Sequence, residues 1–225
     1  MAMKTFMEYL NPIPLEEHLS IETKRQTSLL VDAVYSQYAQ SGTMGPEDVG
    51  WLDGEQNAVK RNEIIYEAGI GKNDSVLDVG CGVCHFYDYL KEQGWEGEYL
   101  GIDPNQKALD LVREEIDTKC GIIEDLNGDT EMLSWDWVIA SGIFNIGLKE
   151  NHMKWTMNDM ISKSNKGVVV NYLKFPYENE QYEAYAPHDI QDWLTENYSP
   201  KKIEVRENYL VTGNTDAEFT IYFYV

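Results

Sequence analysis

A glycine-bearing turn between two short strands constrains the fold of this chain more than any other feature. Residues 75–79 form a short, largely apolar run that contains Asp78; Gly80 and Gly82 follow it, and a second run over 99–102 ends at Asp103. Glycines at the point where a strand turns into a helix carry no Cβ atoms, so a ligand can approach the backbone closely. The stretch 75–105 therefore predicts a strand, a ligand-binding turn, a helix and a second strand.

The rest of the chain continues this alternation of strands and helices. Further strands are expected at 120–124, 135–140 and 168–172, and helices at about 55–68, 108–116 and 153–161. Such alternation predicts a mostly parallel sheet that is covered by helices on both faces. At the C-terminus, 203–211 and 218–225 read instead as two strands joined through a Gly213-Asn214 turn. We expect a seven-stranded three-layer α/β domain with an antiparallel last strand.

The domain organisation follows from the same patterns. The first 70 residues read as helices, since Leu30, Val34 and Tyr38 recur at the spacing of one helix face. The sequence contains no internal repeat and no linker long enough to separate two domains. We therefore expect a single domain over 1–225, with a helical cap over 1–70 and the α/β core over 71–225.

Composition narrows the classes of function. The 225 residues include 39 acidic and 18 basic side chains, a formal net charge of −21, which disfavours tight binding to the phosphates of nucleic acid. No apolar run is long enough to span a membrane, and the N-terminus lacks the apolar segment of a signal peptide. Three cysteines are typical of a reducing compartment, so a cytoplasmic protein is expected.

The run Val76-Leu77-Asp78-Val79-Gly80-Cys81-Gly82 closely resembles the first motif of class I S-adenosylmethionine-dependent methyltransferases. The resemblance implies a Rossmann-like fold, S-adenosylmethionine as cofactor and S-adenosylhomocysteine as product. It places the methionine part of the cofactor along Gly80, Cys81 and Gly82. Asp78 matches the acidic residue that holds the cofactor's ammonium group in this family.

Further cofactor contacts are implied where the later strands end. Asp103, followed by Pro104, matches the family's acidic residue that accepts both ribose hydroxyls, and a carboxylate is suited to this because it only accepts hydrogen bonds. The alternative is that Asp103 merely caps a helix starting at Pro104. The resemblance also implies an adenine contact at Glu124-Asp125 and backbone contacts at Ser141 and Gly142.

Cys84 stands where the family usually has a third glycine, and this departure opens alternatives. Cys81 and Cys84 form a CxxC pair at a helix start, the layout of thiol redox proteins. Together with His85 and Cys120 they could also bind zinc, although we expect no metal. A nicotinamide-binding domain and a non-catalytic cofactor-binding protein are further alternatives. The methyltransferase hypothesis is preferred because it also accounts for Asp78, Asp103 and the C-terminal strand pair.

The methyl acceptor is not determined by the sequence. The Asn/Asp-Pro-Pro-Tyr/Phe tetrapeptide and the Pro-Cys dipeptide of DNA methyltransferases are absent, so a small molecule is expected. The aromatic-rich segment 172–188 is a candidate substrate wall. His85 and His188 are candidate general bases, but the sulfonium is a good leaving group and transfer can need only proximity and alignment.

Overall fold

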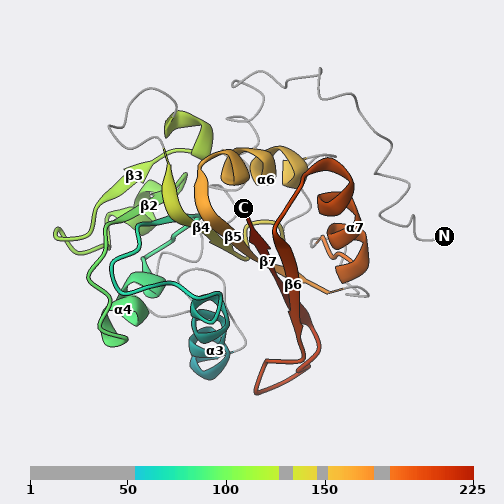
Figure 1. Cartoon of the computed structure of the whole chain (residues 1–225). Helices are drawn as coiled ribbons and strands as arrows, with labels where there is room; N and C mark the ends of the chain where they lie inside the picture. Colours follow the sequence, from blue (N-terminus) through green and yellow to red (C-terminus); the bar gives the residue numbers. More distant parts are fainter. Residues whose placement is uncertain (1–53, 127–133, 146–151, 175–182) are drawn as a thin grey trace.

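A computed structural model of the chain describes residues 54–126, 134–145, 152–174 and 183–225. These residues form one seven-stranded sheet with helices on both faces (Figure 1). Most of the predicted helical cap over 1–70 lies outside the described residues, including the helix expected around Leu30. Only its last helix, α3, belongs to the described part of the chain.

The sheet has the order β3-β2-β1-β4-β5-β7-β6. Its strands are β1 Val76–Val79, β2 Tyr99–Asp103, β3 Thr118–Cys120, β4 Trp135–Ser141, β5 Ser164–Leu173, β6 Lys202–Glu207 and β7 Glu218–Tyr224. Strand β7 runs antiparallel to both of its neighbours, whereas the pairs among β1 to β5 are parallel. The prediction of seven strands with an antiparallel last strand is confirmed.

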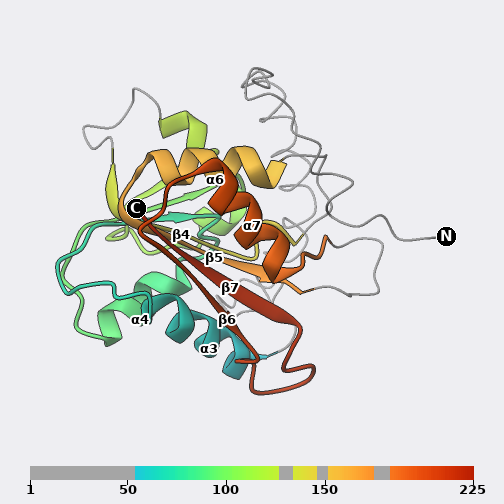
Figure 2. The same cartoon turned by 45° about the vertical axis from the view of Figure 1, so that its right-hand side comes forward.

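Helices cover the two faces of the sheet separately. The helices are α3 Glu55–Tyr66, α4 His85–Glu92, α5 Gln106–Leu109, α6 His152–Ser162 and α7 Pro187–Asn197, with a 3-10 helix η2 over Ile123–Leu126. In both views α6 and α7 lie on one face, and α3 and α4 lie on the other (Figures 1 and 2). The sheet is therefore buried on both faces, as continuous apolar strands require.

The core consists of two apolar layers, one on each face of the sheet. Because successive strand residues point to opposite faces, Leu77 of β1 packs in the layer with α6 and α7, and Val76 packs in the layer with α3 and α4. The same alternation separates Val168 from Val169 in β5. All four residues of β1 are buried, which fixes this strand at the centre of the molecule.

Two expected elements were misplaced, and one helix was not anticipated. The third strand occupies Thr118–Cys120 and not 120–124, because Gly121 has a φ of 150° and the Asp125 carboxylate accepts from Ile122 N to close a turn. The helix expected over 108–116 is a single turn, Gln106–Leu109. Helix α7 was not anticipated, although Ile190, Trp193 and Leu194 follow the spacing of one buried helix face.

Candidate cofactor site

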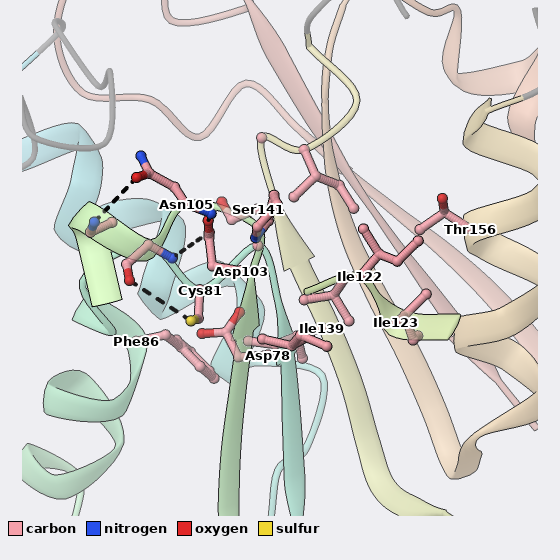
Figure 3. A pocket seen from close by; sticks show the side chains of 18 of the residues that line it. Asp78, Cys81, Phe86, Asp103, Asn105, Ile122, Ile123, Ile139, Ser141 and Thr156 are labelled. Atoms are coloured by element: carbon pink, nitrogen blue, oxygen red, sulfur yellow. Dashed lines mark hydrogen bonds between the residues drawn. The ribbon is translucent and has the colours of Figure 1, made fainter. Parts of the chain in front are cut away.

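A cavity opens where β1, β2 and β4 end, beside the point where the strand order reverses (Figure 3). Ligands bind at such switch points in open α/β sheets, because the loops on either side diverge there. The lining combines three carboxylates, Asp78, Asp103 and Glu124, with a mainly apolar wall. Aliphatic side chains supply much of that wall: Ile65, Val79, Ile102, Ile122, Ile123, Ile139 and Ile143.

Gly80 begins the turn that follows β1. Its N–H donates to the Ile102 carbonyl at 2.7 Å, which ties the turn to β2. Its φ is 74°, in the left-handed region, and a Cβ atom there would lie 2.2 Å from Ile143 Cγ2. Only glycine satisfies both conditions without a shift of its neighbours.

The Asp103 carboxylate is held by two backbone N–H groups. Gly82 N donates to its Oδ2 at 2.9 Å, and Asn105 N donates to its Oδ1 at 2.8 Å. The cap of α5 is Asn105, whose Oδ1 accepts from the backbone N–H groups of Lys107 and Ala108. Asp103 is therefore not the helix cap. It connects the glycine turn to the end of β2 and lines the cavity.

Asp78 lies deeper, at the end of β1, and is 5% exposed. The Tyr99 hydroxyl donates to its Oδ2 at 2.8 Å. Burial, together with the nearby Asp103 charge, raises the pKa of Asp78 to about 7, although the Tyr99 hydrogen bond opposes this. A cation placed in the cavity would stabilise the ionised form of this carboxylate.

Cys84, at the position of the usual third glycine, is the N-cap of α4 and has a φ of 64°. It thus keeps the left-handed backbone that a glycine would favour, a strained conformation for a residue with a Cβ. Its side chain is fully buried and fits because β2 has Gly101 beneath it. A Cβ at Gly101 would lie 2.7 Å from Cys81 Sγ and 3.3 Å from Cys84 Sγ.

The thiols do not have the properties of a redox centre. The contact with Cys84 and burial raise the pKa of the Cys81 thiol, whereas thiol redox chemistry depends on a lowered pKa. Cys120 is exposed and its thiol lies beside the Pro104 carbonyl. Within the described ranges, no group of three His, Cys, Asp or Glu side chains is arranged to hold a metal ion.

Most of the predicted site residues gather around this one cavity. Its lining includes Asp78, Gly80, Cys81, Gly82, His85, Asp103, Pro104, Glu124, Ser141 and Gly142. Asp125 is not part of the lining, because its carboxylate is turned toward Ile122 N. His188 is also outside it, with 76% of its side chain exposed beside Asp189.

The expected substrate wall over 172–188 is placed only in part, because 175–182 lie outside the described residues. Tyr172 and Tyr185 are buried core residues, and Tyr172 stacks between Phe144 and Phe219. Neither tyrosine lines the cavity. Their aromatic rings pack in the layer of the core that includes α7.

Among the lining residues that were not predicted from the sequence, four come from helices α3 and α6. Asn62 and Ile65 come from α3, and His152 and Thr156 come from α6. Each pair is spaced three or four residues apart, the spacing of one helix face, so this signal was present. It could not be assigned to the site because it does not reveal which helix face meets the cavity.

The cavity fits S-adenosylmethionine in its chemistry. The Ser141 hydroxyl is buried and has no hydrogen-bond partner among the described residues, so it can receive a polar ligand group. The buried Asp78 carboxylate suits a positively charged ligand, and the aliphatic wall suits a flat base. The carboxylate of Asp103 is suited to accept hydroxyl groups.

Similarity to known proteins agrees with this geometry. Residues 76–165 match a family model described as a methyltransferase domain. A Mycobacterium tuberculosis protein provisionally named as a methyltransferase is 32% identical over 107 residues, which cover 44% of this chain and 63% of that protein. The chain thus spans less than two thirds of the length of this curated relative.

Solved structures share the fold at low sequence identity. Magnesium protoporphyrin IX methyltransferase from Synechocystis, with S-adenosylhomocysteine bound, superposes with a TM-score of 0.61 at 13% identity, covering 89% of this chain and 99% of that chain. The 1,6-didemethyltoxoflavin-N1-methyltransferase of Burkholderia thailandensis gives 0.60 at 14% identity, covering 94% and 92%.

The strand order and the cavity at its switch point define a doubly wound cofactor-binding domain with a reversed last strand. The central part of the chain, residues 76–165, is thus similar to a methyltransferase domain, and the fold is shared with solved methyltransferases that have S-adenosylhomocysteine bound. None of the helices in the described part is long and apolar enough to cross a membrane.

Proposed function

We propose that this protein transfers a methyl group from S-adenosylmethionine to a small-molecule acceptor. The observation that carries the proposal is the arrangement of Asp78 and Asp103 on either side of the Gly80 turn, within one cavity. When bound, the cofactor supplies an electrophilic methyl group on a sulfonium. The carboxylates and the turn account for the cationic and the ribose parts of that molecule.

Each predicted residue has a distinct role in this proposal. Asp78 holds the ammonium group, Asp103 with Pro104 holds the ribose, and Glu124 faces the adenine end. The backbone around Gly80, Cys81 and Gly82 follows the methionine part, and Ser141 with Gly142 closes the opposite side. Asp125 accepts from Ile122 N and is proposed to support the loop that faces the adenine.

The chain contributes alignment and exclusion of water more than proton transfer. Holding the donor and the acceptor in line can lower the barrier by several kcal/mol, about 7–11 kcal/mol in well-oriented systems. Among the described residues, His85 and His152 are the histidines that line the cavity, so either can take a proton from the acceptor. His188 is too far outside the lining to do so.

A small acceptor agrees with the acidic composition and with the names of similar proteins. The net charge of −21 disfavours nucleic acid. The Burkholderia thailandensis protein is named for methylation of 1,6-didemethyltoxoflavin and the Synechocystis protein for that of magnesium protoporphyrin IX, both small molecules. We further expect the protein to act in the cytoplasm, where its free thiols would remain reduced.

Thermal unfolding in the presence of S-adenosylhomocysteine tests the proposal. At about 100 times its Kd, the ligand should add about 2.7 kcal/mol to the free energy of unfolding and raise Tm. NADH at the same concentration is the matched control and should leave Tm unchanged. An unchanged Tm with millimolar S-adenosylhomocysteine would remove the proposed function. Binding without methyl transfer to any of a panel of amines, phenols and carboxylic acids would favour the non-catalytic alternative.

A further inference from the structure

We propose that Asn62 of α3 binds the amino-acid end of the cofactor, and that the buried Arg61–Glu218 ion pair positions it there. This inference rests on the proposed function, because it assigns one more contact within the same cavity. It makes the C-terminal strand β7 a supporting part of the binding site, although β7 itself contributes no residue to the cavity lining.

Asn62 is a polar side chain that is 6% exposed and lines the cavity. Its amide makes no hydrogen bond to another described side chain and is not sealed off from the cavity, so a bound group can reach it. A ligand in the cavity would satisfy it. Because α3 packs with α4 and β5, and η2 packs with α6 on the other face, Asn62 and Glu124 belong to opposite ends of the site.

The ligand group at this end is identified by charge. The described lining contains three carboxylates and no Lys or Arg, so no full positive charge meets the cofactor's own carboxylate there. An amide N–H donor can hydrogen-bond a carboxylate, and such charge-assisted bonds are stronger than neutral ones. Asn62 therefore suits the amino-acid end, which carries both an ammonium group and a carboxylate.

The residue preceding Asn62 is anchored by a buried ion pair. Arg61 Nη2 donates to Glu218 Oε1 at 2.6 Å and Arg61 Nε donates to Glu218 Oε2 at 2.9 Å, a two-point contact. Both residues are 5% exposed. A buried charge pair with matched geometry fixes orientation, because moving either group would leave a charge unpaired.

The ion pair is held from the sheet side as well. Asn171 Nδ2 donates to Glu218 Oε2 at 2.9 Å and to the Tyr209 hydroxyl at 2.5 Å. Asn171 is the register partner of Ser141, which lines the cavity. The hydrogen bonds around Glu218 therefore reach the cavity lining at two points. One is Asn62, which follows Arg61 in α3, and the other is Ser141, which pairs with Asn171 in the sheet.

The rest of α3 is docked on the same C-terminal segment. Asn57 Oδ1 accepts from Val211 N at 2.9 Å, and the hydroxyl of Tyr224 donates to the Ala68 carbonyl at 3.3 Å just beyond the helix. Tyr222 donates to the Ile64 carbonyl between them. These contacts fix the rotation of α3 against the C-terminal strands. The Arg61–Glu218 pair adds a further contact directly beside Asn62.

The test compares two ligands that differ only at the amino-acid end. S-adenosylhomocysteine carries that end, whereas 5′-methylthioadenosine shares the adenosine part and lacks it. By titration calorimetry, Asn62→Ala should weaken S-adenosylhomocysteine about tenfold or more, the loss of one charge-assisted hydrogen bond. Its effect on 5′-methylthioadenosine should stay within about twofold. Equal losses for both ligands, or no loss for either, would overturn the assignment of Asn62.

The positioning role is tested by Arg61→Met with Glu218→Met, which replaces the buried pair by apolar side chains of similar length. The double variant should fold and should show the same selective loss of S-adenosylhomocysteine affinity. Arg61→Lys should recover part of it. The control is Lys166→Met, which breaks the Lys166–Asp74 pair near the start of β1 and should leave both affinities unchanged.

The outcomes separate this inference from the proposed function. Wild-type protein that binds neither ligand would refute the proposed function. Wild-type protein that binds both, with a double variant that retains full selectivity for S-adenosylhomocysteine, would refute only the positioning role. If the double variant does not fold, the comparison of Arg61→Lys with Asn62→Ala decides, since a positioning role requires both to lose selectivity in the same direction.

Discussion

The two carboxylates at the ends of β1 and β2 line one cavity but have different surroundings: Asp103 is held by backbone N–H groups, and Asp78 is buried with a single hydroxyl donor. Asp103 accepts two backbone N–H groups, from Gly82 and Asn105, which fix the direction of its oxygens. Asp78 is buried with one hydroxyl donor, from Tyr99, and burial raises its pKa to about 7. In the proposed function, the ribose end of the site would be complete before a ligand arrives, whereas the ammonium end would be completed by the ligand's own charge.

This difference shows how one sheet edge can serve two kinds of recognition. A hydroxyl group needs an acceptor of fixed direction, and the loop backbone provides that by holding Asp103. A cation needs a desolvated negative charge, which costs stability while the cavity holds no cation. The second arrangement should depend on pH around neutrality, because burial raises the pKa of Asp78 to about 7.

The largest expected effect is the pH dependence caused by Asp78. Its folded-state pKa of about 7 lies above the ordinary value of 3.8, so the folded protein binds this proton more tightly than the unfolded chain does. The stability that the proton gives is present below about pH 4 and is lost as pH rises toward 7, a change on the order of 4 kcal/mol. Urea unfolding of wild type and Asp78→Asn at several pH values measures it.

Asp78→Asn should remove that contribution, so the difference in free energy of unfolding between variant and wild type should grow in the variant's favour from about pH 4 to pH 7. Wild type should also release a proton when S-adenosylhomocysteine binds below pH 7, detectable as a buffer-dependent calorimetric enthalpy. If the difference in free energy of unfolding between Asp78→Asn and wild type stays constant with pH, the pKa of Asp78 is not raised by burial.

The next effect concerns the ribose end. Asp103→Ala should weaken S-adenosylhomocysteine by about 100-fold, because two charge-assisted hydrogen bonds at roughly 1.5 kcal/mol or more each are lost. The loss should be similar at about pH 6 and pH 8, unlike that of Asp78→Asn. Asp125→Ala is the control, since it also removes a loop contact, to Ile122 N, but lies outside the cavity lining. Equal losses in the two variants would mean that Asp103 acts only by shaping the loop.

The smallest expected effect is at Cys84, which lies between the two carboxylates along the chain. Cys84→Gly relieves the left-handed strain but loses a buried side chain, whereas Cys84→Ala loses packing and keeps the strain. We expect Cys84→Ala to be less stable than Cys84→Gly by about 1 kcal/mol. Chemical denaturation of the two variants measures the difference, and the reverse order would show that the strain at this position is negligible.

The sheet could be predicted from the sequence because the patterns that indicate each strand lie within neighbouring residues. The Val76–Gly82 run and the alternation in 218–225 each specify an element through neighbouring residues, and the sheet contains both. The third strand was misplaced because a glycine and one aspartate, Gly121 and Asp125, decide where it ends. Such side-chain turn contacts have no periodicity.

The candidate site was predicted unevenly for a related reason. Residues on the strand ends could be placed, because parallel strands bring their ends to one edge of the sheet. Asn62 and His152 could not, because helices reach the cavity through tertiary packing. Arg61 illustrates this limit, since its partner Glu218 is 157 residues away in the chain.

Gly101 limits which side chains can stand at positions 81 and 84 during evolution, although it is far from them in the sequence. Since the thiols of Cys81 and Cys84 occupy the space that a Cβ at Gly101 would need, a larger residue can appear at 101 only after these side chains become smaller. The contact with Cys81 is the more severe one, at 2.7 Å, whereas the contact with Cys84, at 3.3 Å, is only tight. Among related proteins, a residue larger than glycine at 101 should therefore be found with small residues at 81 and 84.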